Sequence, residues 1–274
     1  MADFDRVAAL YDRYRPSFEA LRTDALARHA LGDGHGRTAV DLGTGTGAMA
    51  FVVAEHGYRV TGIDHAPLMM EQARRSAARR RADIDFRLGS ATDTGLEPAS
   101  ADLVTASQSW HLFDGQQALT ECHRILRPGG TLLLTTYDWL PQPGSTAHLT
   151  EELIREIDPG WREHGGSGRH DHLAPVVAGH GFTSIRTHTR RFEQRYTLDD
   201  WIGRIRTSSS GGAALPDTER RALEDRMRDT LSSAFPDGDL TVAHIAWSLS
   251  ARTTGGTPPQ PQHALSGTAG QHTP

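Results

Sequence analysis

The sequence predicts an α/β protein with a doubly wound, mostly parallel sheet of seven strands and helical insertions late in the chain. Between residues 37 and 137, strand and helix patterns alternate five times, as a parallel sheet covered by helices requires. The predicted strands, such as TAVDL, ADLVTA and TLLLTTY, are short, apolar on both faces and bounded by turn residues. Strands that are buried on both faces have this composition.

The first half of the chain runs from an N-terminal helix to a third strand. Ser17 and Gly32 are suited to begin and end a helix, and Pro67 is suited to the first turn of another. In chain order, the expected elements are the helix 17–31, the strand 37–42, the glycine loop 43–47, the helix 48–56, the strand 58–63, the helix 67–81 and the strand 83–88.

The second half begins with a strand, a helix and a strand, and then changes character. Asp114 is a suitable N-cap for the helix GQQALTECHRILR, whose apolar residues share one face. After Tyr137 the chain becomes rich in Pro, Gly and His. The expected elements are the strand 102–106, this helix, the strand 131–137, helical insertions near 140–178 and 195–238, and the strands 182–191 and 240–252.

These patterns divide the chain into four segments. Residues 1–36 are expected to form an N-terminal helical cap segment, and residues 37–139 the ligand-binding core. Residues 140–252 would hold the rest of the sheet with inserted cap helices. Residues 253–274 lack core-forming side chains and are expected to be a disordered tail.

Composition excludes several classes of function. The 274-residue chain has a net charge of −5 and a pI of 6.3, which gives no general attraction to nucleic acids or anionic lipids. It has neither an apolar run of about 20 residues nor a basic-then-apolar leader, so we expect a cytoplasmic protein without a membrane partner. The single cysteine, Cys122, excludes an internal disulfide and a cysteine-based zinc site. Every basic residue is arginine, which excludes Schiff-base chemistry by lysine.

The strongest chemical signal is the loop DLGTGTG, residues 41–47, between the first strand and its helix. Its glycines let the backbone pass close to a ligand, and Asp64 follows at the end of the second strand. A carboxylate at that point can accept hydrogen bonds from both hydroxyl groups of a ribose, so the pattern predicts a nucleotide-like ligand. Gly43, Gly45 and Ala48 also satisfy a dinucleotide pattern, which leaves an NAD-linked oxidoreductase open. A buried carboxylate at Asp41 would, however, repel a pyrophosphate.

The ordered motifs DLGTGTG, Asp64, GSAT, SQSWHLFD and HRILRPGG, over about residues 7–137, resemble those of class I S-adenosylmethionine-dependent methyltransferases. The segment YDRYRP, residues 11–16, and the motif SQSWHLFD are similar to the small-molecule branch that includes the trans-aconitate methyltransferases. The resemblance implies the Rossmann-like methyltransferase fold, with residues 37–139 as the S-adenosylmethionine-binding core and substrate-cap helices inserted after it. It implies methyl transfer to an O, N or C atom of a small organic molecule, with S-adenosylhomocysteine as the product.

The resemblance also implies a role for each motif residue. The glycine loop would hold the methionine part of the cofactor, Asp64 the ribose, and the turn after the third strand would border the adenine. Gln108 would lie at the tip of the fourth strand, and the N-terminal segment would close over the cofactor. The implied cofactor-binding residues are Tyr14, Arg15, Asp41, Gly43, Thr44, Gly45, Gly47, Asp64, His65, Met69, Ser90, Ala91, Thr92 and Gln108.

The acceptor side is expected near the ends of the fourth and fifth strands, with Trp110, His111, Tyr137 and Trp139 as substrate-binding residues. His111 is the candidate general base, since histidine can take a proton near neutral pH; a hydrogen-bonding role is an equal alternative. The histidines near residues 164–172 lack the spacing of a metal site, so no metal is expected. Besides an oxidoreductase, a non-catalytic S-adenosylmethionine-binding module stays open. The sequence predicts no oligomeric state.

Overall fold

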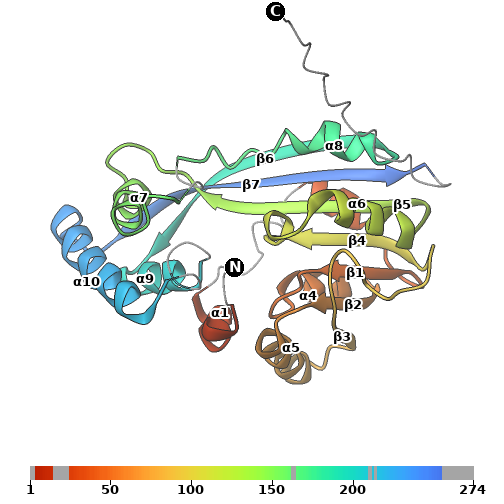
Figure 1. The fold of residues 1–274 in the computed structure, drawn as a ribbon, viewed down its shortest axis with the longest axis horizontal. Coiled ribbons are helices and arrows are strands. Elements are labelled where there is room, and N and C mark those ends of the chain that lie inside the picture. Colours follow the sequence, from red (N-terminus) through yellow and green to blue (C-terminus); the bar gives the residue numbers. More distant parts are fainter. Residues whose placement is uncertain (1–3, 15–24, 162–164, 209–211, 213–214, 255–274) are drawn as a thin grey trace, which may run out of the picture.

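The computed structural model describes residues 4–14, 25–161, 165–208, 212 and 215–254. They contain one seven-stranded sheet in the order β3-β2-β1-β4-β5-β7-β6 (Figure 1). Strands β1 to β5 run parallel, and β7 lies antiparallel between β5 and β6. The prediction of a doubly wound, mostly parallel sheet is confirmed. The strands are β1 Thr38–Leu42, β2 Arg59–Asp64, β3 Ile84–Leu88, β4 Ala101–Ser107, β5 Leu126–Trp139, β6 Phe182–Tyr196 and β7 Leu240–Thr253.

Most of the described helices lie where the sequence patterns placed a helix or a helical insertion. The segment 173–179 forms a helix that the Pro-, Gly- and His-rich composition did not predict. Of the predicted helix 17–31, the described part, residues 25–31, is helical. The helices are η1 Phe4–Val7, α1 Ala8–Tyr14, α3 Ala25–Leu31, α4 Ala48–Glu55, α5 Pro67–Arg80, η2 Trp110–Leu112, α6 Gly115–Ile125, α7 Thr146–Ile157, α8 Leu173–Gly179, α9 Leu198–Arg206 and α10 Asp217–Ala234.

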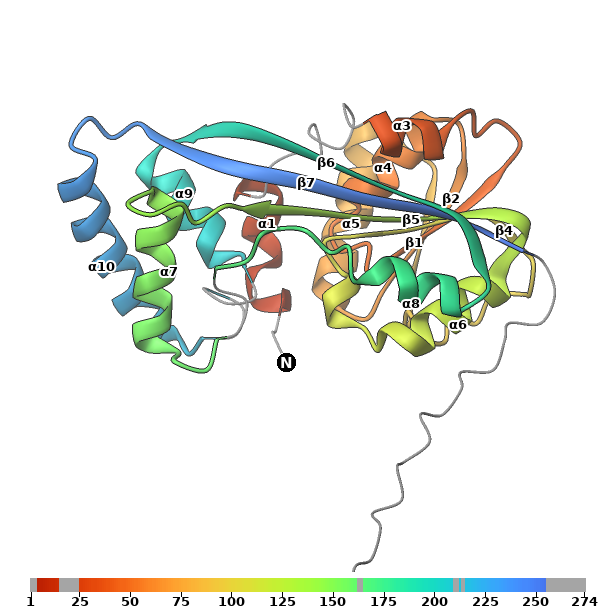
Figure 2. The ribbon, with the colours of Figure 1, turned by 90° about the horizontal axis from the view of Figure 1, so that it is seen from above.

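Two apolar clusters bury the two faces of the parallel sheet. On β4, Leu103 points into a cluster with α3, α4 and α5, while the adjacent Val104 points into a cluster with α6 and α8. Both side chains are fully buried, because successive residues of a strand face opposite sides of the sheet. Figure 2 shows these helices on opposite sides of the strands. The core therefore holds the strand ends, and the loops that follow them, in fixed positions.

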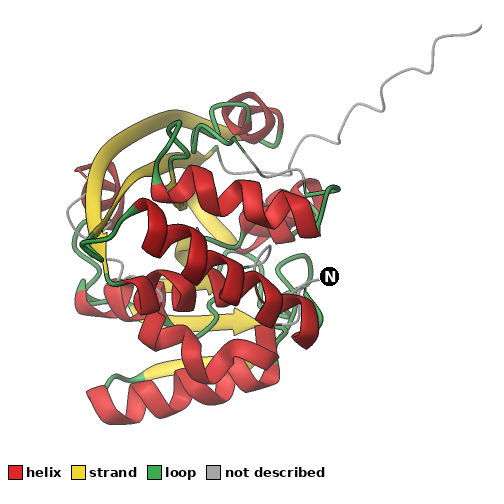
Figure 3. Ribbon diagram, turned by 90° about the vertical axis from the view of Figure 1, so that its left-hand side faces the viewer, coloured by secondary structure: helices red, strands yellow, loops and turns green. Residues whose placement is uncertain are grey.

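Strands β5, β6 and β7 extend well beyond the parallel part of the sheet. At their far end they carry a third apolar cluster with α7, α9 and α10. Figure 1 shows these helices at that end of the strands, and Figure 3, seen from the same end, shows helices in front of the sheet. Trp201 is fully buried there, and its indole Nε1 donates to the Thr150 hydroxyl at 2.9 Å. The helices of this cluster come from both predicted insertions, whereas α8, from the first insertion, packs through Val177 on the core. None of the described helices is long and apolar enough to span a membrane.

Candidate active site

A cleft lies where the carboxyl ends of β1, β2 and β4 meet, and it encloses about 660 Å³, including space open to solvent. The strand order reverses between β1 and β4, and doubly wound sheets bind their ligands at such a point. The described lining residues come from α1, the loop after β1, the turn after β2 and the segment after β4. They are Tyr11, Asp41, Gly43, Thr44, Gly45, Thr46, Ala48, Met49, Asp64, His65, Ala66, Met69, Ser107, Gln108, Ser109, Leu112 and Phe113.

The glycine loop follows β1 with a backbone that side chains would obstruct. Gly43 and Gly45 have φ values of 64° and 54°, in the left-handed region that glycine adopts without strain. A Cβ atom on Gly43 would lie 2.5 Å from the Cβ of Ser109. The amide of Thr44 donates to the carbonyl of Ile63 at 3.0 Å, which holds the loop against β2. The loop therefore forms a tight wall whose backbone faces the cleft.

Asp41 ties this loop to the neighbouring strand β4. Its carboxylate is buried and accepts hydrogen bonds from the hydroxyl groups of Thr44, at 2.7 Å, and Thr105, at 2.6 Å. Burial is the main reason why the pKa of Asp41 is raised from 3.8 to about 6; the two hydroxyl groups oppose this increase and the charge of Asp64 adds to it. The side chain is thus ionised at neutral pH in a place where ionisation is costly.

Asp64 ends β2 and lies across the glycine loop. Its Oδ2 accepts from the amide of Gly45 at 2.8 Å, and its Oδ1 accepts from the amide of Ala66 at 3.0 Å. The side chain is 10% exposed. An ionised carboxylate has about four acceptor positions, so these two bonds leave capacity on both oxygens for a ligand in the cleft.

The charge of the cleft selects among ligands. Two carboxylates, Asp41 and Asp64, line it, and no arginine is among the described lining residues. Like charges brought together without counter-charges repel strongly in a partly desolvated site. The cleft therefore suits a cationic ligand and disfavours a pyrophosphate, which argues against the NAD-linked alternative.

The N-terminal helices form the wall of the cleft opposite the sheet. Asp5 of η1 accepts from the amides of Leu68 and Met69 at 2.8 and 3.3 Å, and it thereby caps α5, which has no capping side chain of its own. Ala8 packs with Met69 in a small apolar cluster. Tyr11 of the same segment lines the cleft. The N-terminal segment is thus attached to the helix that borders the ligand.

Several known proteins are similar to this chain in sequence or fold. The methyltransferase domain family matches residues 40–134. A ubiquinone biosynthesis O-methyltransferase of Xanthomonas campestris is 31% identical over 174 residues, covering 59% of this chain and 72% of that protein. The chain belongs to the class I S-adenosylmethionine-dependent methyltransferases. The cofactor of this family is S-adenosylmethionine.

Two further relatives show how far the likeness extends. An uncharacterised methyltransferase of Mycobacterium bovis is 33% identical over 156 residues. The match covers 57% of the chain described here, which spans 60% of the length of that relative. The fold also matches phosphoethanolamine N-methyltransferase 2 of Haemonchus contortus, solved with phosphomonomethylethanolamine and S-adenosylhomocysteine. That likeness has a TM-score of 0.56 at 18% identity and covers 92% of this chain and 58% of that one.

The structure places part of the predicted cofactor-binding set together in the cleft of the methyltransferase. Asp41, Gly43, Thr44, Gly45, Asp64, His65, Met69 and Gln108 all line it. Gln108 has a positive φ of 57°, which is uncommon for a residue with a long side chain, and its side-chain amide donates to the carbonyl of Tyr137. The spacing of the sequence motifs therefore identified the floor of the cleft.

Other predicted cofactor residues lie outside the lining. Gly47 is the N-cap of α4, and a Cβ there would lie 3.0 Å from Phe86 and 3.1 Å from Phe51. Ala91 is buried in the core, while the hydroxyl groups of Ser90 and Thr92 are 2.8 Å apart in an exposed turn. Tyr14 packs against α9, since a Cβ on Gly203 would lie 2.3 Å from its ring. Arg15 lies outside the described residues.

The predicted acceptor residues also lie beside the lining rather than in it. Trp110 is buried and packs edge-on against the ring of Phe113. His111 is exposed on η2, one residue before Leu112, which lines the cleft. Tyr137 packs against His244 with ring centroids 4.8 Å apart. Trp139 donates from its indole to Glu151 at 2.8 Å and belongs to the border of the helical cluster.

Sequence reasoning missed several lining residues. Most of them flank predicted ones inside the same motifs: Thr46, Ala48, Met49, Ala66, Ser107, Ser109, Leu112 and Phe113. Tyr11 is the exception, because it reaches the cleft only through docking of the N-terminal segment. The motif YDRYRP contained it, and was the signal that could have identified it.

The described residues contain no group of three or more side chains arranged to hold a metal ion. His170 instead contacts the carboxylate of Asp138 at 3.1 Å, and Asp171 accepts from the indole of Trp247 at 3.1 Å. These contacts attach the described part of the histidine-rich loop to the sheet. His164 lies outside the described residues.

Proposed function

We propose that this methyltransferase transfers a methyl group from S-adenosylmethionine to an O, N or C atom of a small organic molecule, leaving S-adenosylhomocysteine. The observation that carries the proposal is the pair of carboxylates, Asp41 and Asp64, at the cleft. S-adenosylmethionine carries a sulfonium and an ammonium group against one carboxylate, so its net charge is positive. The residues present therefore fit this cofactor in charge as well as in position.

Each wall of the cleft has a part in holding the cofactor. We assign the methionine half to the loop of Gly43 and Gly45, where the backbone is unobstructed, and the ribose hydroxyl groups to the remaining acceptor positions of Asp64. His65 and Met69 are assigned to the side of the adenine. Tyr14 and Arg15 are assigned to closure of the N-terminal segment over the cofactor.

The acceptor is assigned to the side of the cleft where β4 and β5 end. Tyr137 and Trp139 lie on the part of β5 that reaches the helical cluster, and Gln108 links that strand to the cleft. We assign Trp110, Tyr137 and Trp139 to acceptor binding, and the helices α7, α9 and α10 to a substrate cap. His111 is the proposed general base for an acceptor that must lose a proton; for other acceptors it would donate or accept a hydrogen bond.

Alignment of the two reactants is the main task of these residues. The bound cofactor supplies an electrophilic methyl group, and displacement at that group is limited by orientation. Holding reactants in a near-attack geometry can supply about 7–11 kcal/mol of the barrier. The likeness of the motifs to the trans-aconitate branch supports a small, soluble acceptor in the cytoplasm, without a nucleic acid or a membrane as partner.

A parallel calorimetric titration with S-adenosylmethionine, S-adenosylhomocysteine and NADH tests the proposal. We expect micromolar binding of the first two ligands and none of NADH. A saturating ligand at 100 times its dissociation constant should raise the free energy of unfolding by about 2.7 kcal/mol. Transfer of a radiolabelled methyl group to a panel of small alcohols, amines and carboxylic acids then tests catalysis. Preference for NADH would overturn the proposal, and cofactor binding without transfer to any acceptor would favour a binding module.

A further inference from the structure

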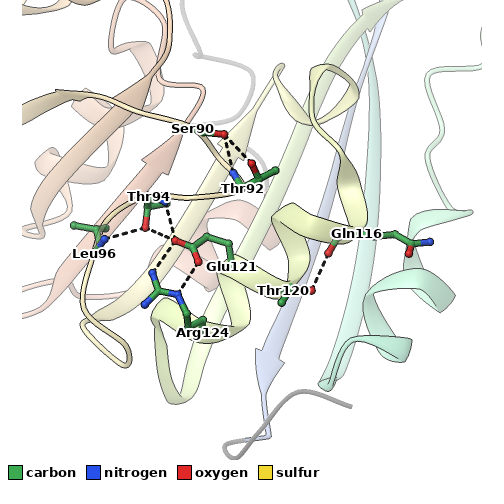
Figure 4. Close-up of polar contacts among 8 residues, drawn as sticks. All are labelled: Ser90, Thr92, Thr94, Leu96, Gln116, Thr120, Glu121 and Arg124. Atoms are coloured by element: carbon green, nitrogen blue, oxygen red, sulfur yellow. Dashed lines mark hydrogen bonds and ion pairs between the residues drawn. The ribbon is translucent and has the colours of Figure 1, made fainter. Parts of the chain in front are cut away.

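We infer that Glu121, on α6, is a positioning residue for the adenine end of the cofactor site. This inference rests on the proposed function. Glu121 does not line the cleft; it acts through Thr94 on residues 89–96, the first part of the connection from β3 to β4. Figure 4 shows Glu121 facing Thr94 on one side and Arg124 on the other.

The loop 89–96 begins at the place that a nucleoside held by Asp64 would reach. Leu88 pairs with Asp64 across the parallel strands β2 and β3, and the amide of Gly89 donates to the carbonyl of Asp64 at 3.0 Å. A base attached to a ribose at Asp64, at the end of β2, would lie next to this loop, which follows the neighbouring strand β3. The hydroxyl groups of Ser90 and Thr92 lie 2.8 Å apart there, where they can meet the edge of a base.

The loop follows the edge strand of the sheet, so no further strand supports it from outside. Leu88, the last residue of β3, is 58% exposed. Glu121 supplies a fixed point from the interior: its Oε1 accepts from both the amide, at 2.8 Å, and the hydroxyl group, at 2.5 Å, of Thr94. Because one oxygen takes both donors, the backbone and the side chain of Thr94 are fixed together.

Glu121 is itself held in one orientation. It is 6% exposed, and Arg124 donates to its two oxygens at 2.7 and 2.8 Å. Such bidentate pairs are among the stronger hydrogen bonds in proteins. Although burial opposes ionisation, these bonds and those from Thr94 keep the pKa of Glu121 below its ordinary value. A charged, fully bonded carboxylate therefore sets the position of Thr94.

Helix α6 connects this fixed point with the other wall of the cleft. Its N-cap, Asp114, directly follows Phe113, which lines the cleft. Further along, the amides of Ala99 and Ser100 donate to the carbonyls of Arg124 and Ile125 at 3.0 and 2.9 Å. The helix thus contacts the segment after β4 at its N-terminus and the loop after β3 through Glu121.

The test compares two ligands that differ only at the base. S-adenosylhomocysteine has an amino group at position 6 of the purine, and S-inosylhomocysteine has an oxygen there. Dissociation constants of both are measured by calorimetry for the wild type, Thr94→Val and Glu121→Gln, together with each melting temperature. Glu97→Gln is the matched control, because Glu97 is an exposed acid on the same connection. Thr94→Val removes one hydroxyl group at nearly constant volume and keeps the interior of α6 intact.

We expect both variants, and not the control, to reduce the preference for S-adenosylhomocysteine by roughly fivefold to tenfold, the effect of losing about one ordinary hydrogen bond between the loop and the base. An unchanged preference in Thr94→Val or Glu121→Gln, with a lower melting temperature alone, would show that Glu121 only stabilises the fold. An equal loss of affinity for both ligands would also overturn the inference. If the wild type binds neither ligand, the proposed function itself fails.

Discussion

The Asp41→Asn variant is expected to be more stable than the wild type at neutral pH and yet to bind S-adenosylmethionine more weakly. The wild-type carboxylate is buried and has its pKa raised from 3.8 to about 6. Each unit of pKa shift corresponds to about 1.36 kcal/mol, so ionisation in the folded state costs about 3 kcal/mol above pH 6. Asparagine has the same shape and carries no charge, and that cost disappears with it.

Part of this gain is lost again through the hydroxyl groups of Thr44 and Thr105. Both donate to the carboxylate, whereas an asparagine can accept from one and must donate to the other. In the variant one hydroxyl group must turn from donor to acceptor, which costs about 1 kcal/mol whatever the pH. The loss of a charged acceptor is not subtracted again, because both bonds already contribute to the pKa of about 6. The net increase in the free energy of unfolding is therefore about 1–3 kcal/mol, with a loss of cofactor affinity because one of the two negative charges of the cleft is gone.

The difference in stability between Asp41→Asn and the wild type should change with pH. A carboxyl group with a raised pKa contributes stability that is present below pH 3.8 and is lost as the pH rises through 6. The variant should thus be about 1 kcal/mol less stable than the wild type near pH 4, become the more stable protein as the pH rises toward 6, and keep a constant advantage above pH 6. Urea denaturation of both proteins between pH 4 and 8, without cofactor, measures this difference.

Asp102→Asn is the control with the opposite sign. Partial burial raises the pKa of Asp102, but hydrogen bonds from Thr38 and Arg127 outweigh this effect and hold the pKa below its ordinary value. Asp102→Asn should therefore be less stable than the wild type at pH 7. A reduced stability of Asp41→Asn that does not change with pH would refute the reasoning, since the hydrogen bonds would then outweigh the cost of the buried charge.

Three further substitutions or reactions test other parts of the structure. Gly43→Ala should lower the free energy of unfolding by about 1–3 kcal/mol and abolish measurable cofactor binding, because the added Cβ meets Ser109 and the residue has a positive φ. Urea denaturation measures the stability and calorimetry the binding. Normal binding would contradict the assignment of this loop to the cofactor. Asp5→Ala should remove the cap of α5, lowering stability by about 0.5–2 kcal/mol, and should raise KM for S-adenosylmethionine more than it lowers kcat, while Asp5→Asn should retain most of both. The Cys122 thiol is fully buried, and burial raises its pKa, so a thiol reagent should label the protein only at the rate of unfolding; rapid labelling of the native protein would contradict the packing of α6.

The sequence carried enough information to predict the parallel half of the sheet. Strings such as TAVDL and TLLLTTY are apolar on both faces and border a glycine, Gly43 or Gly130, so their short length and flanking residues separate them from helices. The extent of β6 was less predictable. Its side chains from Glu193 to Arg195 are exposed or half-buried and polar, because only one neighbouring strand, β7, supports them. Helix α8 escaped prediction because its seven residues give too little periodicity.

The candidate site was predictable where contacts are local in sequence. Asp64 lies at the carboxyl end of β2, beside the loop that follows β1, and parallel pairing brings such residues together. Tyr11 and Phe113 reach the same cleft from distant segments, through the docking of η1 and the packing of η2. The distance of Trp139 from the cleft lining also follows from the length of β5 past the core, which the apolar string TLLLTTY did not indicate.

The three extended strands limit how this protein can admit its ligands. β5, β6 and β7 pass without interruption from the nucleotide-binding half to the helical cluster, joined by ladders of backbone hydrogen bonds. Relative rotation of the two halves would have to bend all three strands at once. The short N-terminal helices are held less extensively, since their described contacts are one aspartate and a small apolar cluster at α5 and the ring of Tyr14 against α9. We expect undocking of these eleven residues, 4–14, to widen access to the cleft while the sheet stays unchanged.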